Sequence, residues 1–120
     1  MALVGGLMVE KPKVVNEVVV GWDVAWSPKR PFAIDMAGFA VNYNHFLNRP
    51  KAKFAYEVKR GYQETEFLRH LVNSLSELEP KAEMCTKVYV FHTRTSRPDL
   101  TLEEKRKTLL LSPSNKDMDL

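Results

Sequence analysis

The chain has 120 residues, 44% hydrophobic and 28% charged, which is enough for one small domain with a core of its own. Its net charge of +3 comes from lysines and arginines interleaved with acidic residues, which argues against a nucleic-acid-binding protein. The single cysteine excludes an internal disulfide, and no apolar run is long enough to cross a bilayer. We expect a mixed α/β fold, with any membrane anchor or export signal outside these residues.

The amino-terminal part of the sequence predicts strands. Residues 3–9 are mostly apolar and read as a strand interrupted by two glycines. Valines at 14–15 and 18–20 flank Asn16-Glu17, a pattern typical of a β-hairpin.

The middle of the chain predicts two helices with a strand between them. Apolar residues recur at helical spacing over 36–47, until Asn48-Arg49-Pro50 ends the pattern. Residues 52–58 alternate like a half-buried strand. Residues 64–72 then return to helical spacing, with apolar side chains on one face.

The carboxyl-terminal part predicts a short strand, a helix and a polar tail. Residues 87–91 read as a strand that ends at His92. Thr101 and Glu104 fit a capping box, which predicts a helix to about residue 111. Beyond Ser112 the residues are polar and we expect them to be frayed. The predicted organisation is a folded unit over 1–111 and a polar tail over 112–120.

Residues 22–39 combine side chains that suit sugar binding. The segment holds two tryptophans, Trp22 and Trp26, together with Arg30 and Asp35. An aromatic face can lie against the C–H face of a sugar ring while the charged side chains hydrogen-bond its hydroxyls. The alternative is that both tryptophans serve only in packing.

Two other positions carry candidate chemistry. Glu64 begins a predicted helix, where the helix dipole favours a carboxylate, so it is a candidate general base or simply a residue that stabilises that helix end. His92 and Arg94 follow a predicted strand two residues apart, so they could bind one phosphate or carboxylate, or be structural. No pattern reads as a metal site, a phosphate loop or a Ser/His/Asp triad.

Several motifs, in order along nearly the whole chain, carry a resemblance to a known family. They are Leu3-Val-Gly-Gly-Leu, Ala25-Trp-Ser-Pro-Lys-Arg-Pro-Phe, Asp35-Met-Ala-Gly-Phe-Ala-Val, Gly61-Tyr-Gln-Glu, Leu78-Glu-Pro-Lys-Ala, Cys85-Thr and His92-Thr-Arg-Thr. The sequence resembles the carboxyl-terminal, acceptor-binding half of the animal beta-1,3-glucuronosyltransferases. These enzymes transfer glucuronic acid from UDP-glucuronic acid to a terminal galactose, on the proteoglycan linker or on glycoprotein glycans.

The resemblance implies a role for each matching position. It makes Glu64 the catalytic base that deprotonates the acceptor hydroxyl as the sugar carbon inverts. The implied acceptor-binding residues are Glu10, Trp26, Arg30 and Asp35, and the implied donor-binding residues are Arg60, His92, Thr93 and Arg94.

The resemblance also implies groups that these residues do not supply. The family belongs to the GT-A-like folds, and its manganese ion is held by an Asp-x-Asp element in a nucleotide-binding half that precedes the matching segment and is absent here. The implied setting is a homodimer on the lumenal side of the Golgi membrane. The alternative to an enzyme is a non-catalytic truncated product that binds galactosides or dimerises with the complete enzyme.

Overall fold

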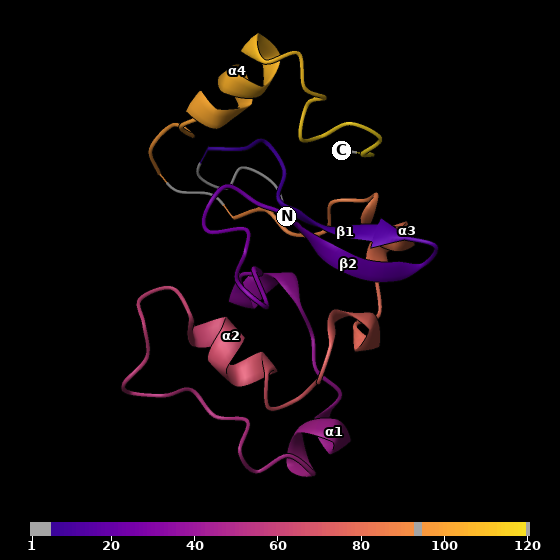
Figure 1. Ribbon diagram of the computed structural model, residues 1–120, viewed down its shortest axis with the longest axis vertical. Helices are drawn as coiled ribbons and strands as arrows, with labels where there is room; N and C mark the ends of the chain where they lie inside the picture. Colours follow the sequence, from indigo (N-terminus) through magenta and orange to yellow (C-terminus); the bar gives the residue numbers. More distant parts are fainter. Residues whose placement is uncertain (1–5, 93–94, 120) are drawn as a thin grey trace.

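A computed structural model describes residues 6–92 and 95–119 as a two-stranded antiparallel sheet with short helices (Figure 1). In chain order the elements are β1 (Lys11–Val15), β2 (Val18–Asp23), the 3₁₀ helix η1 (Met36–Gly38), α1 (Tyr43–Leu47), α2 (Gln63–Leu68), the 3₁₀ helix η2 (Leu75–Glu77), α3 (Lys81–Cys85) and α4 (Thr101–Thr108). The hairpin lies in the middle of the long axis, with α4 towards one end and α1 and α2 towards the other. The small α/β class is confirmed.

The predicted hairpin at the amino-terminal end is confirmed. Strands β1 and β2 pair with Val15 opposite Val18, so Asn16 and Glu17 form a two-residue turn. Both turn residues have positive φ, 49° and 65°, as the tightest hairpin turns require. Val20 is an extra residue in β2 because Lys13 pairs with Gly21 while Val14 pairs with Val19.

The apolar core fills the end of the molecule that contains α2. Its buried members are Trp22, Phe32, Ala33, Ala52, Phe67, Leu68 and Leu71. The ring of Phe67 stacks on Phe54 with ring centroids 4.8 Å apart and lies near the rings of Phe39 and Phe46. This aromatic cluster fixes α2, because Phe67 lies within that helix.

The single helix predicted over residues 36–47 is wrong, since the segment forms η1 and α1 with extended backbone between them. Phe39 has φ −141° and ψ 162°, which ends η1 and turns its ring towards Phe67. The Asn42 side chain then accepts hydrogen bonds from the amides of Asn44 and His45 and starts α1 afresh. The predicted end at Asn48 is confirmed.

The strands predicted over 52–58 and 87–91 are also wrong. An alternating sequence forms a strand only where a neighbour accepts its backbone hydrogen bonds, and the sheet of the described chain contains β1 and β2 alone. Lys87 makes an isolated parallel bridge with Asp119 instead. Of the strand predicted over 3–9, residues 3–5 lie outside the described residues, residues 6–8 form a turn and a bend, and Val9 makes only an isolated bridge.

The two later helices are shorter than predicted. Helix α2 ends at Leu68 and α4 ends at Thr108. The capping box of Thr101 with Glu104 is wrong, because the Asp99 carboxylate accepts hydrogen bonds from both the amide and the hydroxyl of Thr101. The N-cap position is held by Leu100, whose side chain cannot accept a hydrogen bond, so the Asp99 carboxylate satisfies the first helical amide from one residue further back.

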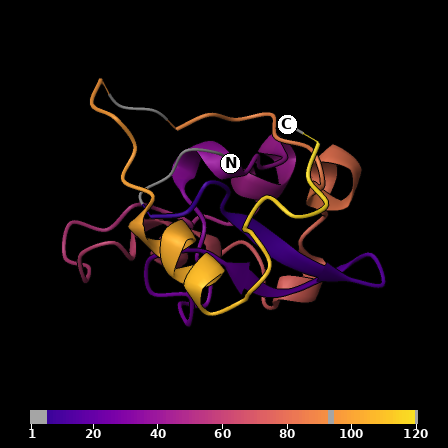
Figure 2. The same ribbon diagram turned by 90° about the horizontal axis from the view of Figure 1, so that it is seen from above.

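We expected the residues beyond Ser112 to be frayed. This expectation is wrong at Ser114, which is fully buried. Its amide and hydroxyl donate to the carboxylate of Glu103, at 2.9 and 2.5 Å, and its hydroxyl oxygen accepts from the amide of Val9 at 3.0 Å. Burial alone would raise the pKa of Glu103, but these hydrogen bonds and one from the Met8 amide together hold it below the ordinary value. The segment after α4 thus returns past the hairpin towards α3 (Figure 2).

No helix in residues 6–92 and 95–119 is both long enough and apolar enough to span a membrane.

Candidate functional site

The two tryptophans have different surroundings. Trp22 is 6% exposed and its indole N–H donates to the carbonyl of Pro31 at 3.1 Å, so it belongs to the core. Trp26 is 50% exposed. The packing interpretation therefore holds for Trp22, while Trp26 retains an aromatic surface that a ligand can reach.

Trp26 lies against the turn that leads into α2. A Cβ atom built on Gly61 would lie 2.4 Å from Cη2 of the Trp26 ring, so the indole edge contacts the glycine backbone directly. The Tyr62 ring meets the indole edge to face, with centroids 6.2 Å apart. Glu64 follows in the first turn of the helix, as predicted. The structure thus joins the aromatic platform to the segment that carries the candidate base.

Arg30 links the same two segments. Its guanidinium carbon lies 4.4 Å from the centroid of the Trp26 ring, in a cation–π contact. Its N–H groups donate to the carbonyls of Ser27 at 3.3 Å, Trp26 at 3.2 Å and Gly61 at 2.8 Å. The loop that starts at Trp26 and the turn before α2 are therefore held by one side chain.

Two of the predicted acceptor residues, Glu10 and Asp35, are carboxylates that line one cleft. The Glu10 carboxylate accepts a hydrogen bond from the amide of Ala25 at 2.8 Å. Burial raises the pKa of Glu10, partly opposed by that hydrogen bond and by the charge of Arg30, while the charge of Asp35 adds to the rise. Glu10 thus contacts the residue before Trp26, Arg30 lies over the Trp26 ring, and Asp35 shares a cleft with Glu10, so the four predicted acceptor residues fall in one region.

Asp35 connects this region to the predicted donor side. Its Oδ2 lies 3.4 Å from Nδ1 of His92, and both side chains are about two fifths exposed. Arg60 is exposed and directly precedes the turn at Gly61. Thr93 and Arg94, also predicted for the donor side, lie outside the described residues.

The Glu64 side chain is half-buried, and no other described residue hydrogen-bonds or pairs with its carboxylate. Its neighbour Glu66 differs, since it pairs with Arg69 at 2.7 Å and His70 at 3.4 Å. A carboxylate without such partners can accept a proton from a ligand hydroxyl.

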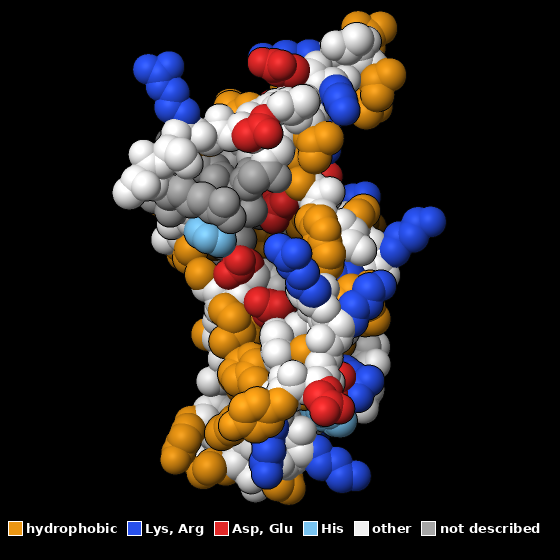
Figure 3. Space-filling model, turned by 90° about the vertical axis from the view of Figure 1, so that its left-hand side faces the viewer, with side chains coloured by type: hydrophobic (Ala, Val, Ile, Leu, Met, Phe, Trp, Pro, Cys, Tyr) orange, Lys and Arg blue, Asp and Glu red, His pale blue; other side chains and the backbone are white. Residues whose placement is uncertain are grey.

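The surface around these residues carries charge next to apolar area. Figure 3 shows acidic and basic side chains in the middle of one face, with hydrophobic side chains below them over the region of α1 and α2. A cleft of about 50 Å³ has Glu10 and Asp35 in its lining, and a larger groove of about 420 Å³ lies between Phe39, His45 and Leu78. Within the part of the chain that the structure describes, no group of three or more His, Cys, Asp or Glu side chains could hold a metal ion.

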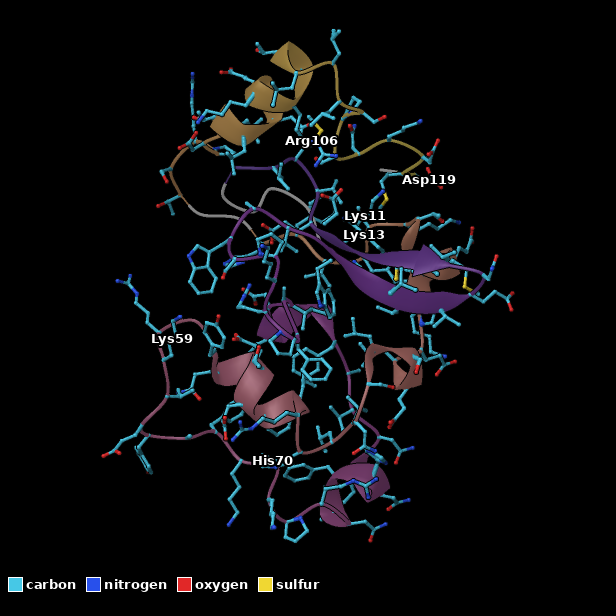
Figure 4. All side chains as sticks on the ribbon, viewed as in Figure 1. Lys11, Lys13, Lys59, His70, Arg106 and Asp119 are labelled. Atoms are coloured by element: carbon cyan, nitrogen blue, oxygen red, sulfur yellow. The ribbon has the colours of Figure 1, made fainter. Side chains whose placement is uncertain are left out.

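Residues 59–62 contain contacts that the sequence did not reveal. Tyr62 packs on Trp26, and the Lys59 ammonium lies 4.9 Å from the centroid of the Tyr62 ring (Figure 4). Gly61 has φ +75°, which L side chains rarely adopt. A glycine and an aromatic residue just before a predicted helix are the signal from which this turn could have been expected.

Comparison with known proteins places this arrangement in a family. Residues 1–96 match the profile of glycosyltransferase family 43. The chain is 51% identical over 106 residues to galactosylgalactosylxylosylprotein 3-beta-glucuronosyltransferase I of Drosophila melanogaster, covering 87% of this chain and 34% of the relative. Galactosylgalactosylxylosylprotein 3-beta-glucuronosyltransferase 1 of Homo sapiens is 54% identical, and the match covers 88% of this chain and 32% of that relative. Enzyme 3 of the same name, also from Homo sapiens, is 48% identical, and the match covers 88% of this chain and 31% of that relative.

The chain therefore spans about a third of the length of these relatives. An identity near one half over almost all of its length leaves no doubt about descent. The chain belongs to glycosyltransferase family 43.

Proposed function

We propose that these residues are the acceptor-binding part of a beta-1,3-glucuronosyltransferase, within the carboxyl-terminal half of a GT-A-like fold. The enzyme transfers glucuronic acid from UDP-glucuronic acid to a terminal galactose of the proteoglycan linker or of a glycoprotein glycan. The names of the relatives support glucuronosyl transfer. The observation that carries the proposal is the packing of Trp26 on Gly61 and Tyr62, which brings the aromatic platform to the helix that bears Glu64.

On the acceptor side, Trp26 supplies an aromatic face for the galactose ring. Glu10 and Asp35 accept hydrogen bonds from its hydroxyls, and Arg30 donates to them. The mutual proximity of Glu10, Arg30 and Asp35 supports this assignment, because a sugar needs both donors and acceptors around its ring.

Glu64 is the general base. Its carboxylate takes the proton of the attacking galactose hydroxyl while that oxygen bonds to the anomeric carbon of glucuronic acid. The bond from that carbon to the diphosphate breaks on the opposite face, so the configuration inverts and UDP leaves with the bonding electrons. A hydroxyl is a weak nucleophile at neutral pH, which is why a positioned carboxylate accelerates this step.

On the donor side, Arg60, His92, Thr93 and Arg94 bind the leaving diphosphate through positive charge and hydrogen bonds. Manganese neutralises that diphosphate when bound. The ligands that we propose for it are the Asp-x-Asp element that the resemblance implies, and no group of three or more His, Cys, Asp or Glu in residues 6–92 and 95–119 could hold a metal ion. We further propose a homodimer on the lumenal side of the Golgi membrane.

Binding of galactobiose to this chain, measured by isothermal titration calorimetry, tests the acceptor assignment. Trp26→Ala is expected to abolish binding because it removes the platform. Tyr89→Ala removes an exposed aromatic ring away from these contacts and is the matched control, with binding expected to persist. Absence of binding by the unaltered chain would contradict the assignment.

Catalysis is tested in a chimera in which this chain replaces the matching 108 residues of human relative 1. With UDP-glucuronic acid and manganese, Glu64→Gln should lower turnover by about 10²- to 10⁴-fold while galactobiose binding persists. Glu66→Gln, in the same helix, is the control and should retain turnover. Transfer that survives Glu64→Gln refutes the role of Glu64, and galactobiose binding without any transfer would favour the non-catalytic galactoside-binding product.

A further inference from the structure

We propose that Arg30 and Gly61 form a latch that positions Glu64 relative to the Trp26 platform. The inference rests on the proposed function only in naming Glu64 as the base. Arg30 is then a positioning residue as well as a group that faces the acceptor. The latch decides how far the base lies from the sugar on the platform.

The first part of the latch is the guanidinium of Arg30. It donates to Ser27 and Trp26 carbonyls within its own loop and to the Gly61 carbonyl, 31 residues away in sequence. Arginine has five N–H donors in a planar fork, so two donors remain for a ligand after these three bonds. A lysine ammonium has neither the fork nor the flat face that stacks on the indole, so it cannot make the same set of contacts.

The second part is the absence of a side chain at Gly61. Its φ of +75° would strain a larger residue, and the Trp26 ring atoms that would lie 2.4 to 3.3 Å from a Cβ atom leave no room for one. The glycine thus lets the indole lie directly on the turn, while its carbonyl accepts from Arg30 at 2.8 Å. The platform and the latch depend on the same residue.

The turn transmits this position to α2. The Tyr62 amide donates to the Lys59 carbonyl at 3.0 Å, and the Tyr62 carbonyl accepts from the Glu66 amide at 2.8 Å. Figure 4 shows Lys59 on the loop that leads into the helix. Since Glu64 lies between Tyr62 and Glu66, a turn held at Gly61 fixes the start of the helix that carries the base.

Hydrogen exchange of the intact chain tests the latch without any sugar. Arg30→Lys should accelerate exchange of the Tyr62 and Glu66 amides by about tenfold or more, because it removes a charged hydrogen bond from the turn. The Ser114 amide, held by Glu103 elsewhere, should be unchanged. Arg97→Lys alters an exposed arginine and is the matched control. No acceleration at Tyr62 and Glu66, or an equal acceleration at Ser114, overturns the proposal.

A measurement on the unaltered chain covers the case in which Arg30→Lys does not fold. Nitrogen-15 NMR of the guanidinium groups should show slow rotation of the Arg30 amino groups, since the carbonyls of Gly61 and Trp26 each accept from one of them, and fast rotation for Arg97. Equal, fast rotation in both side chains overturns the latch. Failure of galactobiose binding would instead overturn the acceptor assignment and leave these two readouts unaffected.

Discussion

Different interactions stabilise the two ends of the molecule. Around α2, aromatic rings stack on Phe67 and exclude water from an apolar core. At the end with α4, the buried Leu7 and Val9 lie beside a buried polar cluster in which the carboxylate of Glu103 accepts hydrogen bonds from Ser114 and Met8. The first end depends on buried apolar area, and the second depends in addition on hydrogen-bond geometry.

The candidate site lies between these two ends. Glu10 precedes the hairpin, and Trp26 follows it and packs on the turn that enters the apolar end. A substitution that destabilises either end can therefore displace the site residues. At the α2 end it acts through lost apolar packing, and at the α4 end through lost hydrogen bonds. Variants that act on one end alone show how strongly each end supports the site.

Phe67→Ala should have the largest effect. Phe67 is buried and its ring contacts three other phenylalanine rings, so truncation leaves a cavity in the aromatic cluster. We expect a loss of about 3–5 kcal/mol in the free energy of unfolding. Urea denaturation followed by circular dichroism measures it. Tyr56→Ala removes a fully exposed ring as the control, and a loss at Phe67 no larger than at Tyr56 would show that the cluster contributes little.

Glu103→Gln should weaken the polar end by about 1.5–3 kcal/mol. An amide keeps the shape, but its NH₂ group cannot accept the hydrogen bonds that Ser114 and Met8 donate. The same denaturation measurement applies, with Glu104→Gln as control because Glu104 is the exposed neighbour in α4. Equal stability of the two variants would contradict a structural role for the buried carboxylate.

Two carboxyl groups, Glu103 at the end with α4 and Glu10 in the candidate site, should respond to pH in opposite directions. The pKa of Glu103 lies below the ordinary 4.5 because its hydrogen bonds outweigh burial, so its stabilising contribution is present above pH 4.5 and is lost as pH falls through the lowered value. The pKa of Glu10 is raised above 4.5, chiefly by burial, so its contribution is present below pH 4.5 and is lost as pH rises through the raised value.

Unfolding free energies of Glu103→Gln and Glu10→Gln, compared with the unaltered chain from pH 3.5 to 7, test this contrast. The deficit of Glu103→Gln should shrink in acid. The unaltered chain should gain stability relative to Glu10→Gln over the same change. If the unfolding free energies of the two variants changed with pH in the same direction relative to the unaltered chain, the opposite pKa shifts of Glu103 and Glu10 would be contradicted.

Local patterns in the sequence predicted the elements whose stability is local. The hairpin at Asn16-Glu17 was predicted because two turn residues between valine pairs fix the register without help from distant residues. The strand predicted over 52–58 does not form. Alternation of apolar and polar residues indicates a half-buried face, but it does not show whether a partner strand is present. The helix predicted over 36–47 was wrong because Phe39 adopts an extended backbone and stacks on Phe67, a distant contact that helical spacing does not report.

The same distinction applies to the site. Resemblance supplied the residue types, and the structure brings Trp26, Arg30 and Glu10 into one region. The role of Gly61 could not be predicted, because it depends on an indole 35 residues earlier lying against its backbone. Ser114 was missed for a similar reason, since a polar tail gives no sign that a buried carboxylate will meet it.

Asp23→Asn should have the smallest effect, and it tests the contact between the hairpin and α4. The Asp23 carboxylate accepts from both amino groups of Arg106, at 3.0 and 3.5 Å, and both side chains are about a quarter exposed (Figure 4). Partial exposure leaves much of the attraction screened by water, so we expect a loss of about 0.5–1 kcal/mol that diminishes as salt is added. Asp117→Asn, at an exposed position, is the control. A loss that does not change with salt would show that the contact between Asp23 and Arg106 acts through its hydrogen bonds, and that charge contributes little to the junction of the two ends.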